Sequence, residues 1–275
     1  MTKTFERMLP LYEAKMLDAY DHRDADVFKS ATAGKRQNQP RYLTDEEKRD
    51  RSREAMPIAW VRESVLPEDL PDWLTGFSDV TSATNERTVL AAAFPRAGVG
   101  HTYPLWFGQR RELLLAVLNS HVLDYLARQK VAGLHLTYGY VRQFPVPTPD
   151  TFEAWCPWSL GTLADWLTER VVRLSVTSHS MVRMASELVG AQHPYAWKAS
   201  ERDLLRAEID AAMFHLYAVS REDVDYIMDT FPIVKRKDEV AHGEYRTKRL
   251  ILETYDQMAE AIASGTPYSS PFDED

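Results

Sequence analysis

The stretch from Arg128 to Asp150 holds basic, polar and aromatic side chains but nothing that resembles a catalytic nucleophile. It reads RQKVAGLHLTYGYVRQFPVPTPD. Side chains of these types hold phosphates and read base edges in DNA. Because similar residues occur between positions 85 and 101, one hypothesis is a DNA-recognition module without chemistry of its own, and the other is a helical interaction or scaffold protein. The candidate residues are Asn85, Arg87, Thr88, Arg96, His101, Arg128, Gln129, Lys130, His135, Tyr138, Tyr140, Arg142 and Gln143.

Structural roles compete with recognition for several of these side chains. Tyr138 and Tyr140 could pack in the core, and Arg142 could be a solvated surface arginine. Arg87, in the segment TNERT, could instead fix a turn by hydrogen bonds. The basic run 235–237, which follows a proline, is open to a phosphate contact, although a solvated loop is the favoured interpretation.

Other chemistry is weakly represented. Glu13-Ala14-Lys15 matches half of a nuclease motif but has no acidic partner upstream, so an exposed helix face is expected. The run 21–23 (Asp-His-Arg) could be a catalytic or phosphate-binding cluster, although a polar cluster at a helix end is favoured. There is no glycine-rich phosphate loop, no Gly-x-Ser-x-Gly segment and no zinc-ligand spacing. Structural roles are expected for Trp155, Trp158, Trp166, Trp197, His179 and His215.

The charge of the chain is unevenly distributed. A formal net charge of −8 argues against a general nucleic-acid binder. Residues 1–150 hold 20 basic and 20 acidic side chains, whereas residues 151–275 hold 13 and 21. Residues 80–149 hold seven basic and three acidic side chains, so a polyanion would meet the middle of the chain.

The composition is that of a globular protein in a reducing compartment. The hydrophobic content is 44%, and the single cysteine, Cys156, cannot form a disulfide within the chain. No apolar run approaches the roughly 18 residues that a membrane span needs. The N-terminal sequence lacks the apolar core of a secretory signal. We therefore expect a cytoplasmic location and no membrane partner.

Periodicity predicts an α+β fold: a small, mainly antiparallel sheet with a helix across it, followed by a helical region. Strands are expected at 73–79, 87–94 and 134–144, and residues 29–56 are expected to be a solvated linker or mobile loop. Helices are expected at 111–130, 159–190, 199–220, 220–232 and 243–264, followed by a frayed tail.

Four blocks of the sequence resemble the C-terminal part of large adenine-specific DNA methyltransferases of restriction–modification and phage-defence systems. These type IIG-like enzymes carry a TaqI-like specificity domain at their C-terminus. The blocks are PLYEAKMLDAYDHRDADVF, WLTGFSDVTSATNERTVLAAAFPRAGVGHT, LLLAVLNSHVLDYLARQKVAGLHLTYGYVRQFPVP and RAEIDAAMFHLYAVSREDVDYIMDTFPIVKRKDEVAHGEYRTKRLILETYDQM. Together they span nearly the whole chain.

The resemblance implies a division of labour. Residues 1–56 would be a partly mobile connector from a methylase domain, 57–150 the target-recognition domain and 151–275 a helical spacer, by analogy with type I specificity subunits. Double-stranded DNA and a methylase domain or subunit would be the partners. The family's S-adenosylmethionine site and its Asn-Pro-Pro-Tyr-type loop are absent, so no cofactor is expected in this chain. A fragment, a split subunit or a truncated gene would each explain this.

Two reservations accompany the resemblance. The family usually has glycine where Ala218 stands, and alanine costs roughly 1 kcal/mol in the left-handed conformation that ends many helices. A different function also remains open, because a helical scaffold or interaction subunit without DNA binding would have a similar composition. The two hypotheses differ in whether substitution of Arg87 or Arg142 alters sequence choice.

Overall fold

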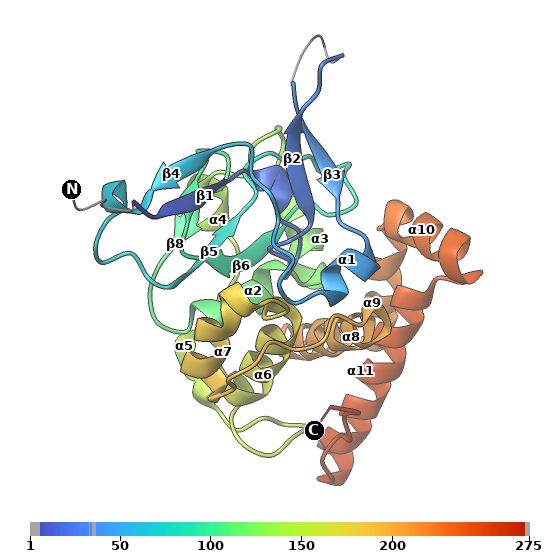
Figure 1. The fold of residues 1–275 in the computed structure, drawn as a ribbon. Helices are drawn as coiled ribbons and strands as arrows, with labels where there is room; N and C mark the ends of the chain where they lie inside the picture. The colour runs from blue at the N-terminus through green and yellow to red at the C-terminus, as the bar shows by residue number, and fades with distance from the viewer. Residues whose placement is uncertain (1–5, 33, 35–36, 273–275) are drawn as a thin grey trace, which may run out of the picture.

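The computed structural model describes residues 6–32, 34 and 37–272, and it has the α+β class that the sequence predicts (Figure 1). In the first sheet, β1 (Met8–Tyr12) lies between β4 (Trp60–Arg62), which is antiparallel to it, and β7 (Gly98–Val99), which is parallel. A separate hairpin joins β2 (Ala25–Lys29) to β3 (Asn38–Tyr42). In the third sheet, β5 (Trp73–Phe77) pairs with β6 (Ala91–Pro95) and β8 (Leu105–Trp106), both antiparallel.

Helices cover one side of the third sheet and make up most of the C-terminal half of the chain (Figure 1). Their bounds are α1 (Asp45–Arg49), α2 (Arg111–Leu118), α3 (His121–Lys130), α4 (Tyr138–Val141), α5 (Pro149–Glu153), α6 (Leu163–Ser175), α7 (Val182–Val189), α8 (Ala199–Leu216), α9 (Arg221–Asp229), α10 (Pro232–His242) and α11 (Arg246–Ser264). Short 3-10 helices occupy Ala14–Met16, Glu63–Val65 and His179–Met181.

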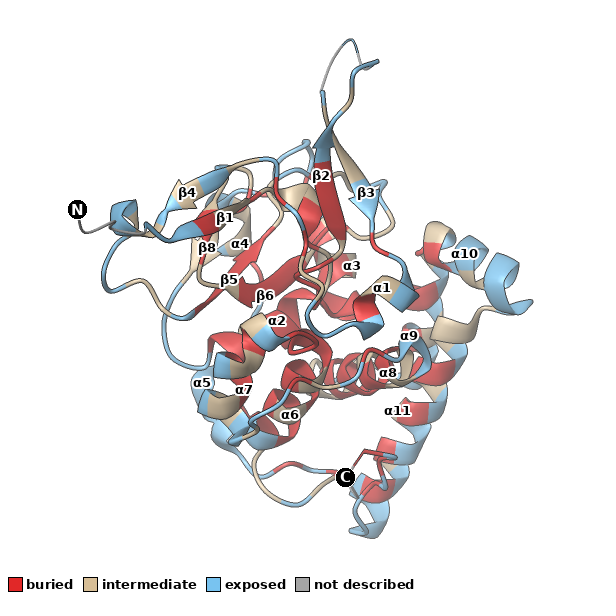
Figure 2. Ribbon diagram, viewed as in Figure 1, coloured by how far each residue is buried: buried red, intermediate tan, exposed pale blue. Residues whose placement is uncertain are grey.

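One hydrophobic core joins the third sheet to the helices (Figure 2). Ala91 and Ala93 of β6 are fully buried, and these small side chains let α2 and α6 pack closely on the strand. The core continues from Tyr20 to Phe272, so buried residues from all three predicted regions meet in it. The boundaries at residues 56 and 150 stay predictions, since they do not coincide with a break in this core.

The strand predicted at 134–144 is wrong. Residues 134–136 pair only briefly with residues 79–81: Leu136 N donates to Asp79 O at 2.7 Å and Thr81 N donates to Leu134 O at 3.0 Å. The chain then forms α4. The positions packed in or against the core are 136, 140, 141 and 144, which is a helical spacing rather than the alternation of a strand.

Two predicted long helices are each broken in two. The helix predicted at 111–130 stops at Asn119, whose side chain pairs with backbone groups of the neighbouring strand, and restarts with Ser120 as the N-cap of α3. The helix predicted at 159–190 begins only at residue 163 and is interrupted after Ser175, where Thr177 and Ser178 bond to N-terminal residues. In both places, tertiary hydrogen bonds replace the helical ladder.

Several other expectations need correction. The predicted linker at 29–56 contains β3 and α1, with Leu43, Lys48 and Ala55 buried; within it, residues 33, 35 and 36 lie outside the described part. The strand predicted at 87–94 begins only at residue 91, and α8 ends at residue 216. The basic run 235–237 is helical, within α10. In the tail predicted to be frayed, Tyr268 and Phe272 are buried, and residues 273–275 lie outside the described part.

The expected structural roles of the tryptophans and histidines are confirmed only in part. Trp158, Trp166 and Trp197 are buried, whereas Trp155 is 67% exposed. His215 stacks on Tyr255 and hydrogen-bonds its carbonyl at 3.0 Å, but the His179 side chain is exposed. The strand at 73–77 and the helices α9 and α11 agree with the prediction to within a few residues.

Candidate nucleic-acid interface

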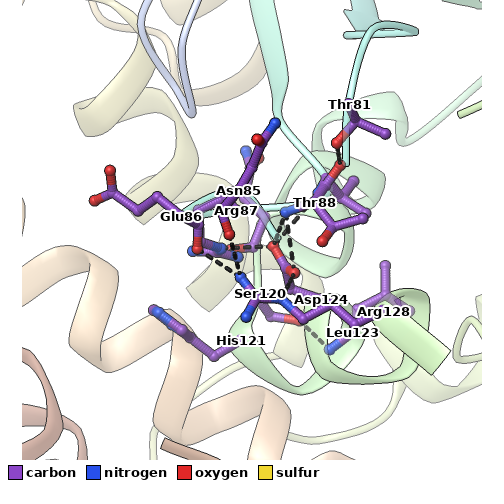
Figure 3. Close-up of polar contacts among 12 residues, drawn as sticks. Thr81, Asn85, Glu86, Arg87, Thr88, Ser120, His121, Leu123, Asp124 and Arg128 are labelled. Atoms are coloured by element: carbon purple, nitrogen blue, oxygen red, sulfur yellow. Dashed lines mark hydrogen bonds and ion pairs between the residues drawn. The ribbon is translucent and has the colours of Figure 1, made fainter. Parts of the chain in front are cut away.

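The turn at residues 84–88 is tied to α3 through the carboxylate of Asp124 (Figure 3). Arg87 Nε donates to Oδ2 of Asp124 at 2.7 Å, and Arg128 Nε donates to Oδ1 at 3.0 Å. The backbone N–H of Thr88 also donates to this carboxylate, at 2.9 Å. The outer nitrogens of the two guanidinium groups donate to the carbonyls of Asn119, Asn85 and Glu86. One buried acid thus connects the turn to α3, and Arg87 also reaches the end of α2 through the Asn119 carbonyl.

The Asp124 carboxylate is 0% exposed but remains ionised. Burial by itself would raise its pKa, but the guanidinium groups of Arg87 and Arg128 and the Thr88 N–H outweigh that effect and hold the pKa below its ordinary value. Arg87, Thr88 and Arg128, predicted as DNA contacts, therefore use their main donors inside the fold. The turn-fixing role weighed for Arg87 is the one that its hydrogen bonds support.

Arg96, another predicted contact, also points into the protein. Its Nη2 donates to Pro67 O at 2.8 Å, and its Nη1 donates to Leu70 O. These carbonyls belong to the segment before β5, which places Arg96 as a tether for that segment. Little of its hydrogen-bonding capacity remains for a ligand.

The two tyrosines divide between the core and the surface. Tyr140 is half-buried and packs against the core. Tyr138 is 45% exposed; its ring meets Phe77 edge-on at 5.6 Å, and its hydroxyl donates to Leu105 O at 2.5 Å. Nearby, the ring of His135 is 62% exposed and its Nδ1 hydrogen-bonds Oδ2 of Asp79 at 3.0 Å.

The remaining predicted residues are exposed and lie on connected segments. The backbone of Asp79 joins the segments of His101 and His135, because its N–H donates to Thr102 O at 2.9 Å and its carbonyl accepts from Leu136 N. Arg128 joins Asn85 to the end of α3, because its Nη2 donates to Asn85 O at 2.9 Å. We call the exposed set the recognition surface. It consists of Asn85, His101, Gln129, Lys130, His135, Arg142 and Gln143.

The recognition surface is cationic because acidic residues are missing from its longest segment. Residues 125–149 contain no Asp or Glu, although the chain has 41. Lys130 and Arg142 are exposed, and no carboxylate in the described part of the chain lies within ion-pair distance of either. These two side chains are therefore available to phosphates.

No protein-family model matches the chain, and no curated protein or solved structure is significantly similar to it. The comparisons thus assign no family. The resemblance of the four sequence blocks to adenine-specific methyltransferases stays a prediction.

Two adjoining grooves lie beside the recognition surface. The larger, of about 990 Å³, has His101 and Ser78 on one wall, and the smaller, of about 630 Å³, has Asn85. Both include Glu86 and Lys237. Carboxylates outnumber cationic side chains in each; the larger holds Glu13, Asp18, Asp24 and Glu86 against Lys15 and Lys237. Phosphates would therefore meet the rims of these grooves rather than their floors.

Two buried polar residues that hold this region together, Asn119 and Asp210, were not predicted from the sequence. The Asn119 amide accepts from Ala91 N at 2.9 Å and donates to Ala91 O at 2.8 Å, so it substitutes for a strand partner of β6. Asp210 of α8 accepts from His121 N at 2.7 Å and from His121 Nδ1 at 2.8 Å. The serine after Asn119 is a local signal for the helix break. The pairing of Asn119 with Ala91 and of Asp210 with His121 has no local signal in the sequence.

Of the two weaker clusters, the one at 21–23 is structural, whereas residues 13–15 are half-buried at a short 3-10 helix and do not form the exposed helix face that was expected. Glu13 forms an ion pair with Lys15 at 3.1 Å. The Arg23 guanidinium is fully buried and donates to four carbonyls, those of Lys48, Asp50, Arg53 and Thr177. His22 Nε2 hydrogen-bonds Ser178 at 2.8 Å. The cluster thus lies in a buried loop and fastens the N-terminal region to the helices, rather than capping a helix end.

Neither a metal cluster nor a membrane span is found in the described residues. No three His, Cys, Asp or Glu side chains gather there in a way that could hold a metal ion. No described helix is both long and apolar enough to cross a bilayer.

Proposed function

We propose that the chain recognises double-stranded DNA through the recognition surface. The observation that carries this proposal is the acid-free segment 125–149, on which Lys130 and Arg142 are exposed and have no carboxylate partner in the described structure. Amide and imidazole side chains that can read bases lie next to these cations, at Asn85, Gln129 and His135. Cations would position the duplex, and the neighbouring side chains would choose the sequence.

In this proposal Arg87, Thr88, Arg96 and Arg128 support the surface without contacting bases. Arg87 and Arg128 fix the 84–88 turn against α3, so Asn85 is presented from a rigid backbone. A recognition side chain discriminates well only if its own position is fixed. The buried Asp124 would therefore influence DNA selectivity indirectly.

The resemblance adds a catalytic partner to this proposal. A methylase domain or subunit of the adenine-N6 type would bind S-adenosylmethionine, flip the target base and methylate it, while this chain selects the site. The chain itself contributes binding and orientation, with no catalytic step. The chain would then be a fragment or split subunit of a restriction–modification enzyme.

The test is selection of bound duplexes from a randomised DNA pool at low and moderate salt, with sequencing of the bound fraction. The chain is tested alone and with any adenine methylase encoded beside it. We expect an enriched motif and binding that weakens with salt. Salt-sensitive binding without a motif would leave a nonspecific clamp, and no binding in either setting would overturn the proposal.

A second candidate, a protein-interaction subunit, draws support from exposed apolar side chains at the N-terminal sheets. Phe28, Met56 and Trp60 are each about half exposed, and the backbone of Val27 bonds to that of Met56 at 2.8 Å. Exposed apolar clusters often mark contacts with other proteins. This candidate predicts tight association with a protein and no salt-sensitive DNA binding.

A further inference from the structure

Helix α10 stands out from the rest of the helical region (Figure 1). Of its residues only Val234 is buried, and Val240 is 85% exposed. Pro232 begins the helix, and Gly243 ends it in a left-handed conformation with φ of 76°. A helix with so little burial gains little stability from packing, so its exposed side chains are open to a partner.

The start of α10 is fixed beside the recognition surface. Lys237 forms an ion pair with Glu86, the neighbour of Asn85 in the 84–88 turn. Arg128 Nη1 donates to Thr230 O at 3.3 Å, and its guanidinium group lies 4.1 Å from the centre of the Phe231 ring. The turn, the end of α3 and the first turn of α10 therefore meet.

The cations of the region 221–249 fall into two groups. Most are neutralised by carboxylates: Arg221 by Asp256, Lys237 by Glu86, Arg246 by Asp203, Lys248 by Asp225 and Asp229, and Arg249 by Glu244 and Glu253. Lys235 and Arg236 are exposed, and neither has a carboxylate partner within the described ranges. Like Lys130 and Arg142, neither side chain is held in an ion pair within the described part of the chain, although Glu239 lies about one helical turn from both on α10.

We propose that Lys235 and Arg236 hold the phosphate backbone of the DNA whose sequence the recognition surface reads, which makes α10 a second DNA-binding element. This inference rests on the proposed function. Phosphate contacts set the position of a duplex without selecting its sequence, and adjacent basic side chains on an exposed helix suit that role. The helical region then contributes to DNA binding instead of serving only as a spacer.

The ion pair between Lys237 and Glu86 makes the combined surface compatible with DNA. Glu86 lies in the 84–88 turn, where an unpaired carboxylate would repel a phosphate. Lys237 offsets this charge and at the same time holds α10 against the turn. Lys235 and Arg236 are then two further exposed cations on the helix that this ion pair holds beside the turn.

The test compares the double variant Lys235→Ala/Arg236→Ala with the wild-type chain and with Arg7→Ala/Arg183→Ala. Arg7 and Arg183 are also exposed, each within ion-pair distance of a carboxylate, and they lie next to β1 and in α7. Helix α7 lies apart from α10 (Figure 1). Each protein is titrated with a duplex that carries the selected motif and with a scrambled duplex, over a series of salt concentrations.

We expect the α10 variant to bind both duplexes about tenfold more weakly at low salt, by a similar factor for each. The plot of log affinity against log salt should become shallower by about 2, because two phosphate contacts are lost. The motif enriched from a random pool should not change. The control variant and a charge-conserving variant, Lys235→Arg/Arg236→Lys, should bind like the wild type.

Two results would overturn this inference while the proposed function survives. In the first, the α10 variant binds DNA as tightly as the wild type, while the Lys130→Ala/Arg142→Ala variant binds DNA weakly. The other is a changed motif in the α10 variant, which would mean that α10 reads bases. A wild-type chain that binds no DNA, alone or with its methylase partner, would instead refute the proposed function and this inference together.

Discussion

Arginine side chains do two different kinds of work in this protein, and their partners distinguish them. Arg87 and Arg128 share the buried Asp124, and Arg23 holds four carbonyls together. Arg142 is exposed without a carboxylate partner in the described structure. The buried or paired arginines stabilise loops that have little regular structure, and the exposed, unpaired arginine is available to a ligand. Residue type alone does not distinguish these two roles.

Replacing Asp124 by asparagine should destabilise the fold strongly. The amide keeps the shape of the side chain but leaves two poorly exposed guanidinium groups without a counter-charge. We expect the free energy of unfolding, measured by urea denaturation, to fall by about 3 kcal/mol. As the control, Asp256→Asn removes an exposed ion pair with Arg221 and should cost less than about 1 kcal/mol. Equal losses in the two variants would contradict the role assigned to Asp124.

Asp24 should make stability depend on pH. Burial first, and then the nearby Asp18, raise the pKa of its carboxyl to about 7, while Lys48 opposes the shift. The folded state therefore favours the neutral acid. Its contribution to stability is complete at low pH and is lost as the pH rises from about 4 towards 7.

Asp24→Asn removes this titration. We expect the free energy of unfolding of the variant, relative to wild type, to rise by on the order of 2 kcal/mol between pH 4.5 and pH 7.5. Denaturant titrations at both pH values measure the difference, with the exposed Asp69 replaced by asparagine as a control. A difference that does not change with pH would show that Asp24 is not perturbed.

At the scale of elements, the sequence anticipates those that depend on local signals. The strand β5 and the helices α9 and α11 follow from periodicity, caps and turns. The helix break after Ser175 does not, because Ser178 bonds to the distant His22. At Asn119 the following serine is a local signal, but the pairing of Asn119 with Ala91 is not. The segment 134–144 misleads because its aromatic and β-branched composition suits a strand although its buried positions have helical spacing.

The end of α8 provides a test at this scale. Ala218 is exposed and has φ of 51°, so the chain keeps the left-handed turn that glycine would adopt without steric cost. Ala218→Gly should raise the free energy of unfolding by about 0.5–1 kcal/mol. Ala259→Gly, inside α11, should lower it by a similar amount. Thermal and urea unfolding would measure both, and destabilisation by Ala218→Gly would show that the strain is absent.

At the scale of the whole molecule, the N-terminal sheets, the predicted recognition region and the helices depend on one another. Arg23 and His22 bond to residues about 155 positions later in the chain, and Asp210 of α8 holds the start of α3. The recognition surface is therefore built on the helical region and not on the sheets alone. The sequence predicted which residue types would gather in this surface, but only the fold shows which of them face solvent.

Acidic and unpaired basic side chains lie on different parts of the molecule. Carboxylates line the grooves, whereas unpaired cations stand on the recognition surface and on α10. This separation explains how a chain with a net charge of −8 could approach DNA with one face. It also predicts that loss of these unpaired cations will weaken DNA binding more than loss of exposed cations elsewhere.

The measurement that tests the central claim most directly is the affinity of Lys130→Ala/Arg142→Ala for duplex DNA at low and moderate salt, beside the wild type and Arg7→Ala/Arg183→Ala. All three proteins are first shown to have the same unfolding transition. We predict that the first variant binds at least about tenfold more weakly, while the control binds like the wild type. Equal binding by all three proteins would contradict the assignment of the recognition surface as the DNA-binding face.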